Sequence, residues 1–285
     1  AAVAITVRVV MTAFPGAKPQ WQQIVVFTSI LSMAIGAFAA IGQTNIKRLM
    51  AYSSIGNVGY VLLGLASGTE KGIQSVVFYL AIYMVMTLGV FAVILLMKRK
   101  EIMVEEVSDL SGLGRSHPMM ALAMLIFMFS LAGIPPMAGF WGKLYIFMAA
   151  VEAKLYVPAV LGVLASVVAS YYYLRIVKVM YFDEPAAAPL DATNDAPTGL
   201  VLAAATAFTL FFFVAPGPVV GWANAAAKTS RAFRSTDSCA YSARTPAPLT
   251  NRPAIPGTPV LLTYTRDAFA ECERVLHVGE HPPFS

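Results

Sequence analysis

The sequence predicts an all-α fold, a polytopic bundle of transmembrane helices. Of its 285 residues, 58% are hydrophobic and only 12% are charged, whereas soluble globular domains carry about 25% charged residues. The mean hydropathy is +0.69. The apolar residues form long runs without a polar stripe, which is typical of membrane helices, and they lack the short alternating segments of a β-barrel. The composition therefore excludes an ordinary soluble enzyme.

The apolar runs match the length of about 20 residues that crosses about 30 Å of hydrocarbon. We expect one partial span and six fuller spans, at residues 1–14, 21–43, 49–67, 72–97, 119–151, 155–181 and 199–222. The predicted transmembrane domain covers residues 1–232. Because the chain begins at Ala1 and shows no signal peptide, we also expect its N-terminal part to be missing.

Basic residues in the loops predict the orientation of these spans, because lysine and arginine concentrate in cytoplasmic loops. The net charge is +5. One set of alternate loops is flanked by the larger group, Lys47, Arg48, Lys98, Arg99, Lys100, Arg115, Arg175 and Lys178, and the other set by Lys18, Lys71 and Lys154. The loops near 44–48, 98–118 and 182–198 are therefore expected in the cytoplasm, or in the matrix of an organelle. The positive charge thus reflects membrane topology, and no nucleic acid partner is predicted.

The composition changes at about residue 233. Seven of the 18 prolines and both cysteines, Cys239 and Cys272, lie beyond this point. We expect residues 233–285 to form a Pro-rich tail that is disordered or misjoined. Cys272, His277 and His281 offer metal-ligand atoms in this tail, but such a pattern gives only weak support for zinc, and no metal site is predicted.

Lys143 is an ionisable residue inside an apolar span. The run 119–151 would be about 50 Å long as one helix, which exceeds the thickness of the membrane. Gly133, Pro135 and Pro136 supply a break, because successive prolines remove backbone donors and clash with the preceding turn. Transporters use such interrupted helices to place ion-binding groups at the midplane. We predict that Lys143 carries a proton step; the alternative is that it snorkels to an interface beside a kinked helix.

A second polar concentration follows the turn that contains Lys47. Ser53, Ser54 and Asn57 lie inside the next span and, with Lys47, are candidates for a water-filled proton path. The alternative is that the hydroxyl groups bond backbone carbonyls and that the lysine belongs to an ordinary cytoplasmic turn.

The remaining motifs predict anchoring rather than chemistry. The run 171–173 of three tyrosines, followed by Arg175 and Lys178, predicts an interfacial anchor where a span leaves the membrane. The sequence contains no Walker loop, dinucleotide fingerprint, HExxH motif or Ser–His–Asp set on the spans, so no cofactor is predicted in this chain.

Three stretches carry a family resemblance: QTNIKRLMAYSSI at 43–55, DLSGLGRSHP at 109–118 and SLAGIPPMAGFWGK at 130–143. Together they resemble the subunit N family of proton-pumping NADH:quinone oxidoreductase, respiratory complex I, whose mitochondrial counterpart is NADH dehydrogenase subunit 2. The first and third stretches are shared in outline with sibling subunits and with cation/proton antiporter subunits, whereas the run 45–48 and the run 171–175 favour subunit N. The resemblance covers about residues 1–232.

The resemblance implies an antiporter-like bundle with inverted repeats, each containing a broken helix. On that map the chain corresponds to the C-terminal half, with the second repeat at about 21–181. Lys143 matches the broken-helix lysine that exchanges protons with the side opposite the cytoplasm. FMN, iron–sulfur clusters and quinone reduction are expected in other subunits, and the other membrane-arm subunits and the lipid bilayer are the expected partners. The expected location is the bacterial plasma membrane, or the inner mitochondrial membrane if the protein is organellar.

The sequence is also compatible with two other functions. The chain could be a subunit of a cation/proton antiporter assembly, or a structural membrane scaffold in which Lys143 is incidental. A single half-channel is not expected to pump unaided.

Overall fold

The computed structural model describes residues 5–7, 9, 18–99, 102–103, 105–135, 137–185 and 196–214. These residues lie within one compact unit, residues 1–224. Most of the expected partial span at 1–14, the residue Pro136 and the whole tail at 233–285, with its cysteines and its two histidines, lie outside the described residues.

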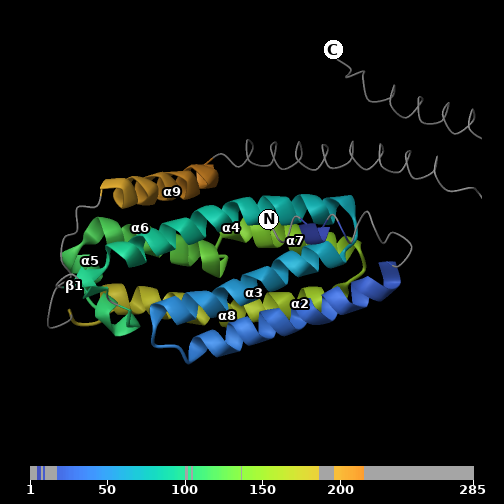
Figure 1. The fold of residues 1–285 in the computed structure, drawn as a ribbon, viewed down its shortest axis with the longest axis horizontal. Coiled ribbons are helices and arrows are strands. Elements are labelled where there is room, and N and C mark those ends of the chain that lie inside the picture. Colours follow the sequence, from blue (N-terminus) through green and yellow to red (C-terminus); the bar gives the residue numbers. More distant parts are fainter. Residues whose placement is uncertain are drawn as a thin grey trace, which may run out of the picture. The chain divides into compact units, whose positions relative to one another are not determined.

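Seven longer helices form the described part of the unit (Figure 1). Their bounds are α2 Lys18–Ile41, α3 Ile46–Ala66, α4 Glu70–Leu96, α6 Pro118–Ala132, α7 Ala138–Glu152, α8 Tyr156–Phe182 and α9 Ala196–Val214. Between α4 and α6 lie the strands β1 Lys98–Arg99 and β2 Ile102–Met103, the 3-10 helix η3 Val107–Leu110 and the short helix α5 Leu113–Ser116. Apart from this antiparallel pair of two-residue strands, the described fold is all-α.

Four helices, α2, α3, α4 and α8, are long and apolar enough to cross a membrane. The helices α6 and α7 have 15 residues each, or about 22 Å, and follow one another along the bundle (Figure 1). The single long run predicted at 119–151 is therefore one broken helix.

Local sequence sets where α3 and α4 begin. The Asn45 side chain accepts hydrogen bonds from the backbone nitrogens of Lys47 and Arg48, at 3.0 and 3.1 Å. The Thr69 hydroxyl accepts from the Gly72 nitrogen at 3.1 Å. Both side chains satisfy backbone donors that the first turn of a helix leaves unpaired.

Small residues let α2 and α3 lie close together. A Cβ atom on Gly36 would overlap the backbone of Gly56, and one on Gly59 would meet Met33. Close approach of backbones at small residues is the usual mode of helix packing in membranes. The main core fills the space between α3, α4, α6 and α8 with fully buried side chains such as Met86 and Phe127.

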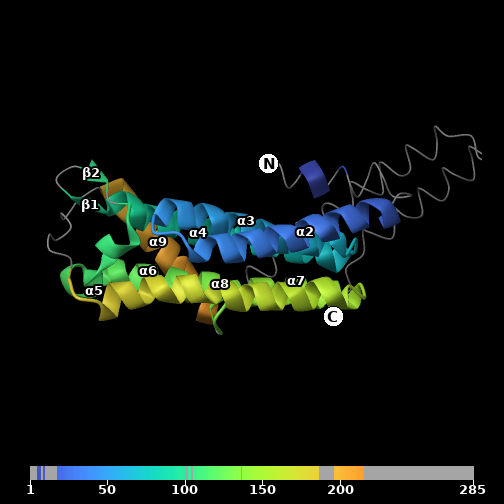
Figure 2. The same ribbon diagram turned by 90° about the horizontal axis from the view of Figure 1, so that it is seen from below.

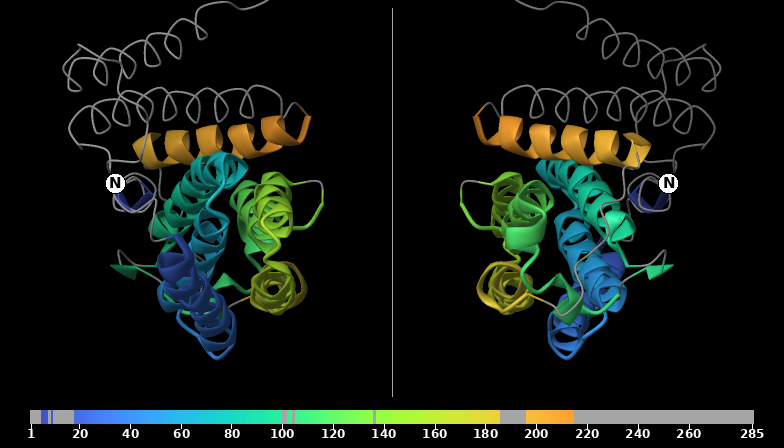
Figure 3. Two further views of the ribbon diagram at one scale, coloured as in Figure 1. Left: turned by 90° about the vertical axis from the view of Figure 1, so that its right-hand side faces the viewer. Right: turned by 90° about the vertical axis from the view of Figure 1, so that its left-hand side faces the viewer.

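The views from below and from the ends show how the helices are arranged. The long helices run along a common direction, with α8 beside the α6–α7 pair (Figure 2). Helix α9 crosses the others on the side of α4 and α6 (Figure 3).

Contacts between loops identify the two ends of the bundle. At one end, which we call the Lys47 end, the Val107 nitrogen donates to the Thr44 carbonyl at 2.8 Å. At the other end, which we call the Lys71 end, Lys71 at the start of α4 forms an ion pair of 2.8 Å with Glu152 at the end of α7. The loops near 44–48 and 98–118, which the basic residues predict on one side of the membrane, are thus in direct contact.

Candidate functional site

The helix break at the end of α6 is made by backbone geometry. Gly133 adopts φ +83°, in the left-handed region that favours glycine. Its nitrogen donates to the Phe129 and Ser130 carbonyls at 3.2 and 3.0 Å, and the Ile134 nitrogen donates to the Phe129 carbonyl at 3.1 Å. These bonds end the helix before Pro135 is reached. As a result, the carbonyls of the last turn of α6 face the start of α7.

Lys143 occupies the space that this break opens. Its side chain is 5% exposed. The Nζ atom donates to the Leu131 carbonyl at 2.9 Å, to the Ala132 carbonyl at 3.3 Å and to the Ser166 hydroxyl at 3.0 Å. Three acceptors match the three protons of an ammonium group.

A serine pair on α8 completes the contact between Lys143 and the broken helix. The Ser170 hydroxyl contacts both the Ala132 carbonyl, at 3.3 Å, and the Ser166 carbonyl, at 2.9 Å. Among the residues that the structure describes, none of the ion pairs includes Lys143. The charged form of Lys143 is therefore stabilised by the dipoles of two carbonyl groups and one hydroxyl group. These groups can also form hydrogen bonds with the neutral amine.

The first turn of α7 fixes the position of Lys143 relative to α6. The Gly139 nitrogen donates to the Ser130 hydroxyl at 3.0 Å, and this hydroxyl in turn contacts the Met86 sulfur at 2.8 Å. A Cβ atom on Gly139 would overlap the Ser130 carbonyl. Lys143 follows Gly139 by one helical turn. The close approach of Gly139 to Ser130 therefore sets the distance from the Lys143 side chain to the Leu131 and Ala132 carbonyls.

A buried cluster of hydroxyl and amide groups lies on α3, α4 and α8. The Asn57 amide nitrogen donates to the Ser53 hydroxyl at 3.3 Å and to the Tyr173 hydroxyl at 3.4 Å, and its oxygen accepts from the Tyr79 hydroxyl at 2.8 Å. The Ser53 and Tyr173 hydroxyls also bond each other. We call Ser53, Asn57, Tyr79 and Tyr173 the hydroxyl cluster.

Ser54 extends this polar region. Its hydroxyl donates to the Met50 carbonyl at 2.9 Å and accepts from the Tyr83 hydroxyl at 3.1 Å. Three predicted path residues, Ser53, Ser54 and Asn57, therefore lie in one region with two tyrosines of α4.

The tyrosines of this region were not found from the sequence. The interpretation of the run 171–173 as an interfacial anchor is wrong for two of its members, because Tyr172 and Tyr173 are only 2% and 1% exposed, whereas Tyr171 is 59% exposed. Consecutive residues on a helix point about 100° apart, so a run of three cannot share one environment. The spacing Tyr79 and Tyr83, one turn apart on α4, is the signal that could have found the cluster.

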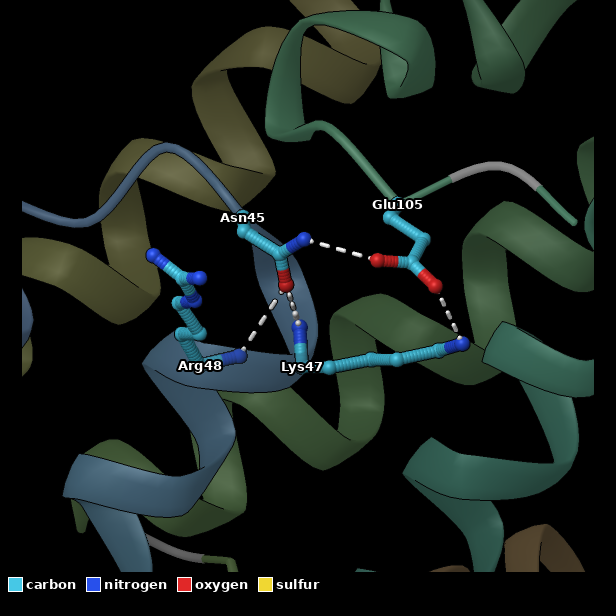
Figure 4. A network of polar contacts seen from close by, with 4 residues as sticks. All are labelled: Asn45, Lys47, Arg48 and Glu105. Carbon is cyan, nitrogen blue, oxygen red and sulfur yellow. Dashed lines mark hydrogen bonds and ion pairs between the residues drawn. The ribbon is translucent and has the colours of Figure 1, made fainter.

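Lys47 lies in a separate network at the Lys47 end (Figure 4). Its Nζ atom is 2.7 Å from the Glu105 carboxylate, and both side chains are partly exposed. The Asn45 amide donates to the same carboxylate at 2.9 Å. The hydrogen bonds from Lys47 and Asn45 lower the pKa of the Glu105 carboxyl. The contact clamps the β1–β2 segment to the start of α3, and the described contacts do not join Lys47 to the hydroxyl cluster.

Removing the Glu105 charge should loosen this clamp. In inverted membrane vesicles of cells that carry Glu105→Gln, we expect trypsin to cleave after Lys98 and Arg99 up to about fivefold faster, the range that surface ion pairs contribute. In the unchanged protein the clamp itself should weaken as the pH falls through the lowered pKa of Glu105, because a depressed carboxyl pKa stabilises only above that pH. Trypsin does not act at such pH, so this weakening is measured as faster amide hydrogen exchange in the β1–β2 segment. Glu106→Gln, in the neighbouring exposed residue, is the control, and equal rates in both variants would contradict the clamp.

The fold and the site define a class of protein. The described part is a multi-pass helical membrane protein with a broken helix, and the terminal carbonyls of its first half accept hydrogen bonds from a buried lysine. In the described residues no group of three or more His, Cys, Asp or Glu could hold a metal ion.

The chain belongs to the family described as NADH:quinone oxidoreductase/Mrp antiporter, TM, whose model matches residues 1–169. It is 58% identical over 232 residues to a protein of Methylobacterium nodulans named NADH-quinone oxidoreductase subunit N, which covers 80% of this chain and 47% of that protein. The resemblance to subunit N is thereby confirmed. The chain spans about half the length of the curated relatives it matches.

Solved structures confirm the antiporter-like fold. A chain in respiratory complex I from Thermus thermophilus with bound aureothin is 34% identical, with a TM-score of 0.63, over 70% of this chain and 45% of that one. A chain in the Mrp complex from Dietzia sp. DQ12-45-1b has a TM-score of 0.67 over 79% of this chain and 50% of that one. The identity in the second case is 23%, so this likeness concerns the fold alone.

Proposed function

We propose that the chain is a proton-translocating membrane subunit of NADH:quinone oxidoreductase, in which Lys143 gains and loses the proton. The observation that carries this proposal is the setting of Lys143, buried at a helix break and bonded to two carbonyls and Ser166. An ionisable group inside a membrane is costly and marks a functional site by default. Because its partners are dipoles, a change of charge elsewhere in the complex can shift the proton affinity of Lys143.

The other predicted residues take supporting roles in this proposal. Ser53, Ser54 and Asn57 would hold part of the proton path, and Lys47 would lie at its solvent-exposed side. Gly133 would end α6, and Pro135 and Pro136, which have no backbone N–H group, would leave the last carbonyls of α6 free for Lys143.

The chemistry of electron transfer belongs to other subunits in this proposal. FMN, iron–sulfur clusters and quinone reduction would lie outside this chain, which would bind no cofactor itself. Its partners would be the other membrane-arm subunits and the lipid bilayer, and its location the bacterial plasma membrane or the inner membrane of a mitochondrion.

A second candidate function is that of a subunit in a cation/proton antiporter assembly. It is favoured by the family description, which includes Mrp antiporters, and by the likeness of the fold to a chain of the Dietzia Mrp complex. The identity of 58% to a protein named as subunit N favours the first proposal.

Deletion of the gene separates these two functions. We expect membranes of the deletion strain to lose NADH-driven quinone reduction and proton uptake, while growth at raised sodium and alkaline pH is unchanged. Restoring the gene should restore both membrane activities. Loss of sodium or alkali tolerance with intact NADH-linked respiration would instead support the antiporter.

A further inference from the structure

The side chain of Tyr60 on α3 contacts both Lys143 and a member of the hydroxyl cluster, Tyr79. The Lys143 Nζ atom lies 5.1 Å from the centre of the Tyr60 ring, within the range of a cation–π contact. The Tyr60 hydroxyl also faces Ser166, which is itself a partner of Lys143. One tyrosine thus contacts the ammonium through its ring and the partner serine through its hydroxyl.

Aromatic contacts hold the Tyr60 ring in place. It meets the ring of Tyr79 edge-on, with centroids 6.4 Å apart, and the ring of Phe147 edge-on, at 6.0 Å. Tyr79 belongs to the hydroxyl cluster through its bond to Asn57. Tyr60 therefore lies between the two polar groups and is 3% exposed.

The polar residues of α4 continue away from Tyr60 in one direction. Tyr79, Tyr83 and Thr87 follow one another at intervals of four residues, so they lie along one face of the helix. Helix α4 runs from the Lys71 end to the Lys47 end, and the series approaches the Lys47 end.

Thr87 gives an independent sign that this line is hydrated. Its hydroxyl is buried and has no hydrogen-bond partner among the residues that the structure describes. Buried hydroxyls without a protein partner are usually bonded to an ordered water molecule. A water at Thr87 would extend the line of hydroxyl groups by one turn beyond Tyr83.

We propose that Tyr60 relays protons between Lys143 and the hydroxyl cluster, and that this cluster leads along Tyr83 and Thr87 to the Lys47 end. In each transfer the Ser166 hydroxyl passes a proton from the Lys143 Nζ atom to the Tyr60 hydroxyl. The Tyr60 hydroxyl gives up its own proton, through an intervening water molecule, to the Tyr79 or Tyr173 hydroxyl, so the tyrosine is unchanged. Tyr60 also positions Lys143 through its ring. The inference rests on the proposed function. By resemblance, Lys143 is expected to exchange protons with the side opposite the cytoplasm. The relay adds a second connection, from Lys143 to the Lys47 end.

Two substitutions at Tyr60 separate the relay from the packing. Tyr60→Phe keeps the ring, its edge contacts and the cation–π contact but removes the hydroxyl, whereas Tyr60→Leu removes the ring as well. In inverted membrane vesicles, we expect Tyr60→Phe to lower NADH-driven proton uptake about three- to tenfold, the factor that one hydrogen bond contributes. Its solvent deuterium isotope effect should increase, because proton transfer becomes rate-limiting. Tyr60→Leu should lose more uptake than Tyr60→Phe.

Tyr145→Phe is the matched control. Tyr145 lies on α7 near Lys143, is 37% exposed and packs edge-on against Phe78, with centroids 5.1 Å apart. Its loss of a hydroxyl should leave proton uptake and the isotope effect unchanged. NADH oxidation with an artificial acceptor that bypasses quinone reports assembly in every variant.

Thr87→Val tests the far end of the line, because valine keeps the shape of threonine without its hydroxyl. We expect proton uptake to fall while acceptor activity persists. Normal uptake in Tyr60→Phe would overturn the relay, and normal uptake in Thr87→Val would overturn the route to the Lys47 end. If uptake is normal in these variants but lost in Lys143→Ala, only this inference fails; if Lys143→Ala is also normal, the proposed function fails with it.

Discussion

Replacing Lys143 with alanine is expected to lower NADH-driven proton uptake at least about tenfold, since a positioned proton-transfer group contributes about 10²–10⁴ in rate. The substitution removes the ionisable group and leaves the Leu131 carbonyl without its Lys143 donor, whereas the Ala132 carbonyl keeps its contact with the Ser170 hydroxyl. An unpaired buried carbonyl costs about 1–3 kcal/mol, a cost that water in the vacated space can reduce. We therefore expect the subunit to assemble. The measurement compares proton uptake with NADH oxidation by an artificial acceptor in inverted vesicles.

Arginine at the same position gives a sharper form of this test. Lys143→Arg supplies donors to the same carbonyls but stays protonated at all accessible pH values. We expect Lys143→Arg to assemble as well as the unchanged protein and still to lose proton uptake. Lys71→Ala is the control, because Lys71 is an exposed lysine in a surface ion pair with Glu152, and such pairs contribute little. If both Lys143 variants pump normally, the lysine is incidental and the function of a structural membrane scaffold is favoured.

The positions of the spans could be predicted because hydropathy depends mainly on local composition. The run predicted at 72–97 corresponds to α4, Glu70–Leu96, and the run at 155–181 to α8, Tyr156–Phe182. The ends differ by one or two residues where a capping side chain such as Thr69 starts the helix before the first apolar residue.

The residues predicted to break the helix have different parts in the structure. α6 ends at Ala132, where Gly133 adopts a left-handed conformation. The prolines at 135 and 136 lack the backbone N–H groups that would otherwise bond the carbonyls of residues 131 and 132. A proline in a sequence is a strong signal for the end of a helix. A glycine is not, because glycine occurs both at helix ends and inside helices that pack closely. Only the backbone geometry distinguishes the two.

The spacing of Tyr79 and Tyr83 indicates a shared helix face, but their pairing with the site could not be predicted, because it depends on contacts between distant helices. Ser53 and Tyr173 bond each other across 120 positions of the chain, and neither residue alone differs from a packing residue. Lys47 shows the opposite case: its charge is conspicuous in the sequence, yet its partner in the structure is the surface residue Glu105. The hydroxyl cluster and the Lys47 network therefore differ in burial and in hydrogen-bond partners, and neither property can be read from residue type.

Gly139→Ala is expected to have the second large effect, because it acts on the contact that holds α7 against the end of α6. The new Cβ atom would overlap the Ser130 carbonyl, and overpacking of this kind costs about 1–3 kcal/mol. Moving α7 away would also weaken the bond from the Gly139 nitrogen to the Ser130 hydroxyl and draw Lys143 away from its carbonyl partners. We expect less subunit in the membrane and, per assembled complex, a loss of proton uptake, measured by quantitative immunoblotting and by the ratio of uptake to acceptor activity.

Gly199→Ala is the control for this substitution, because a Cβ atom at Gly199 meets no atom within 4 Å and alanine favours a helix over glycine. The double variant Gly139→Ala, Lys143→Ala tests whether the loss of uptake arises through the lysine. Changes that act through one group are not additive, so the double variant should pump no worse, per assembled complex, than Lys143→Ala alone. A further loss of uptake in the double variant would mean that Gly139 supports proton transfer by a route that bypasses Lys143. Normal uptake in Gly139→Ala would mean that proton transfer tolerates a larger distance between α6 and α7 than the structure has.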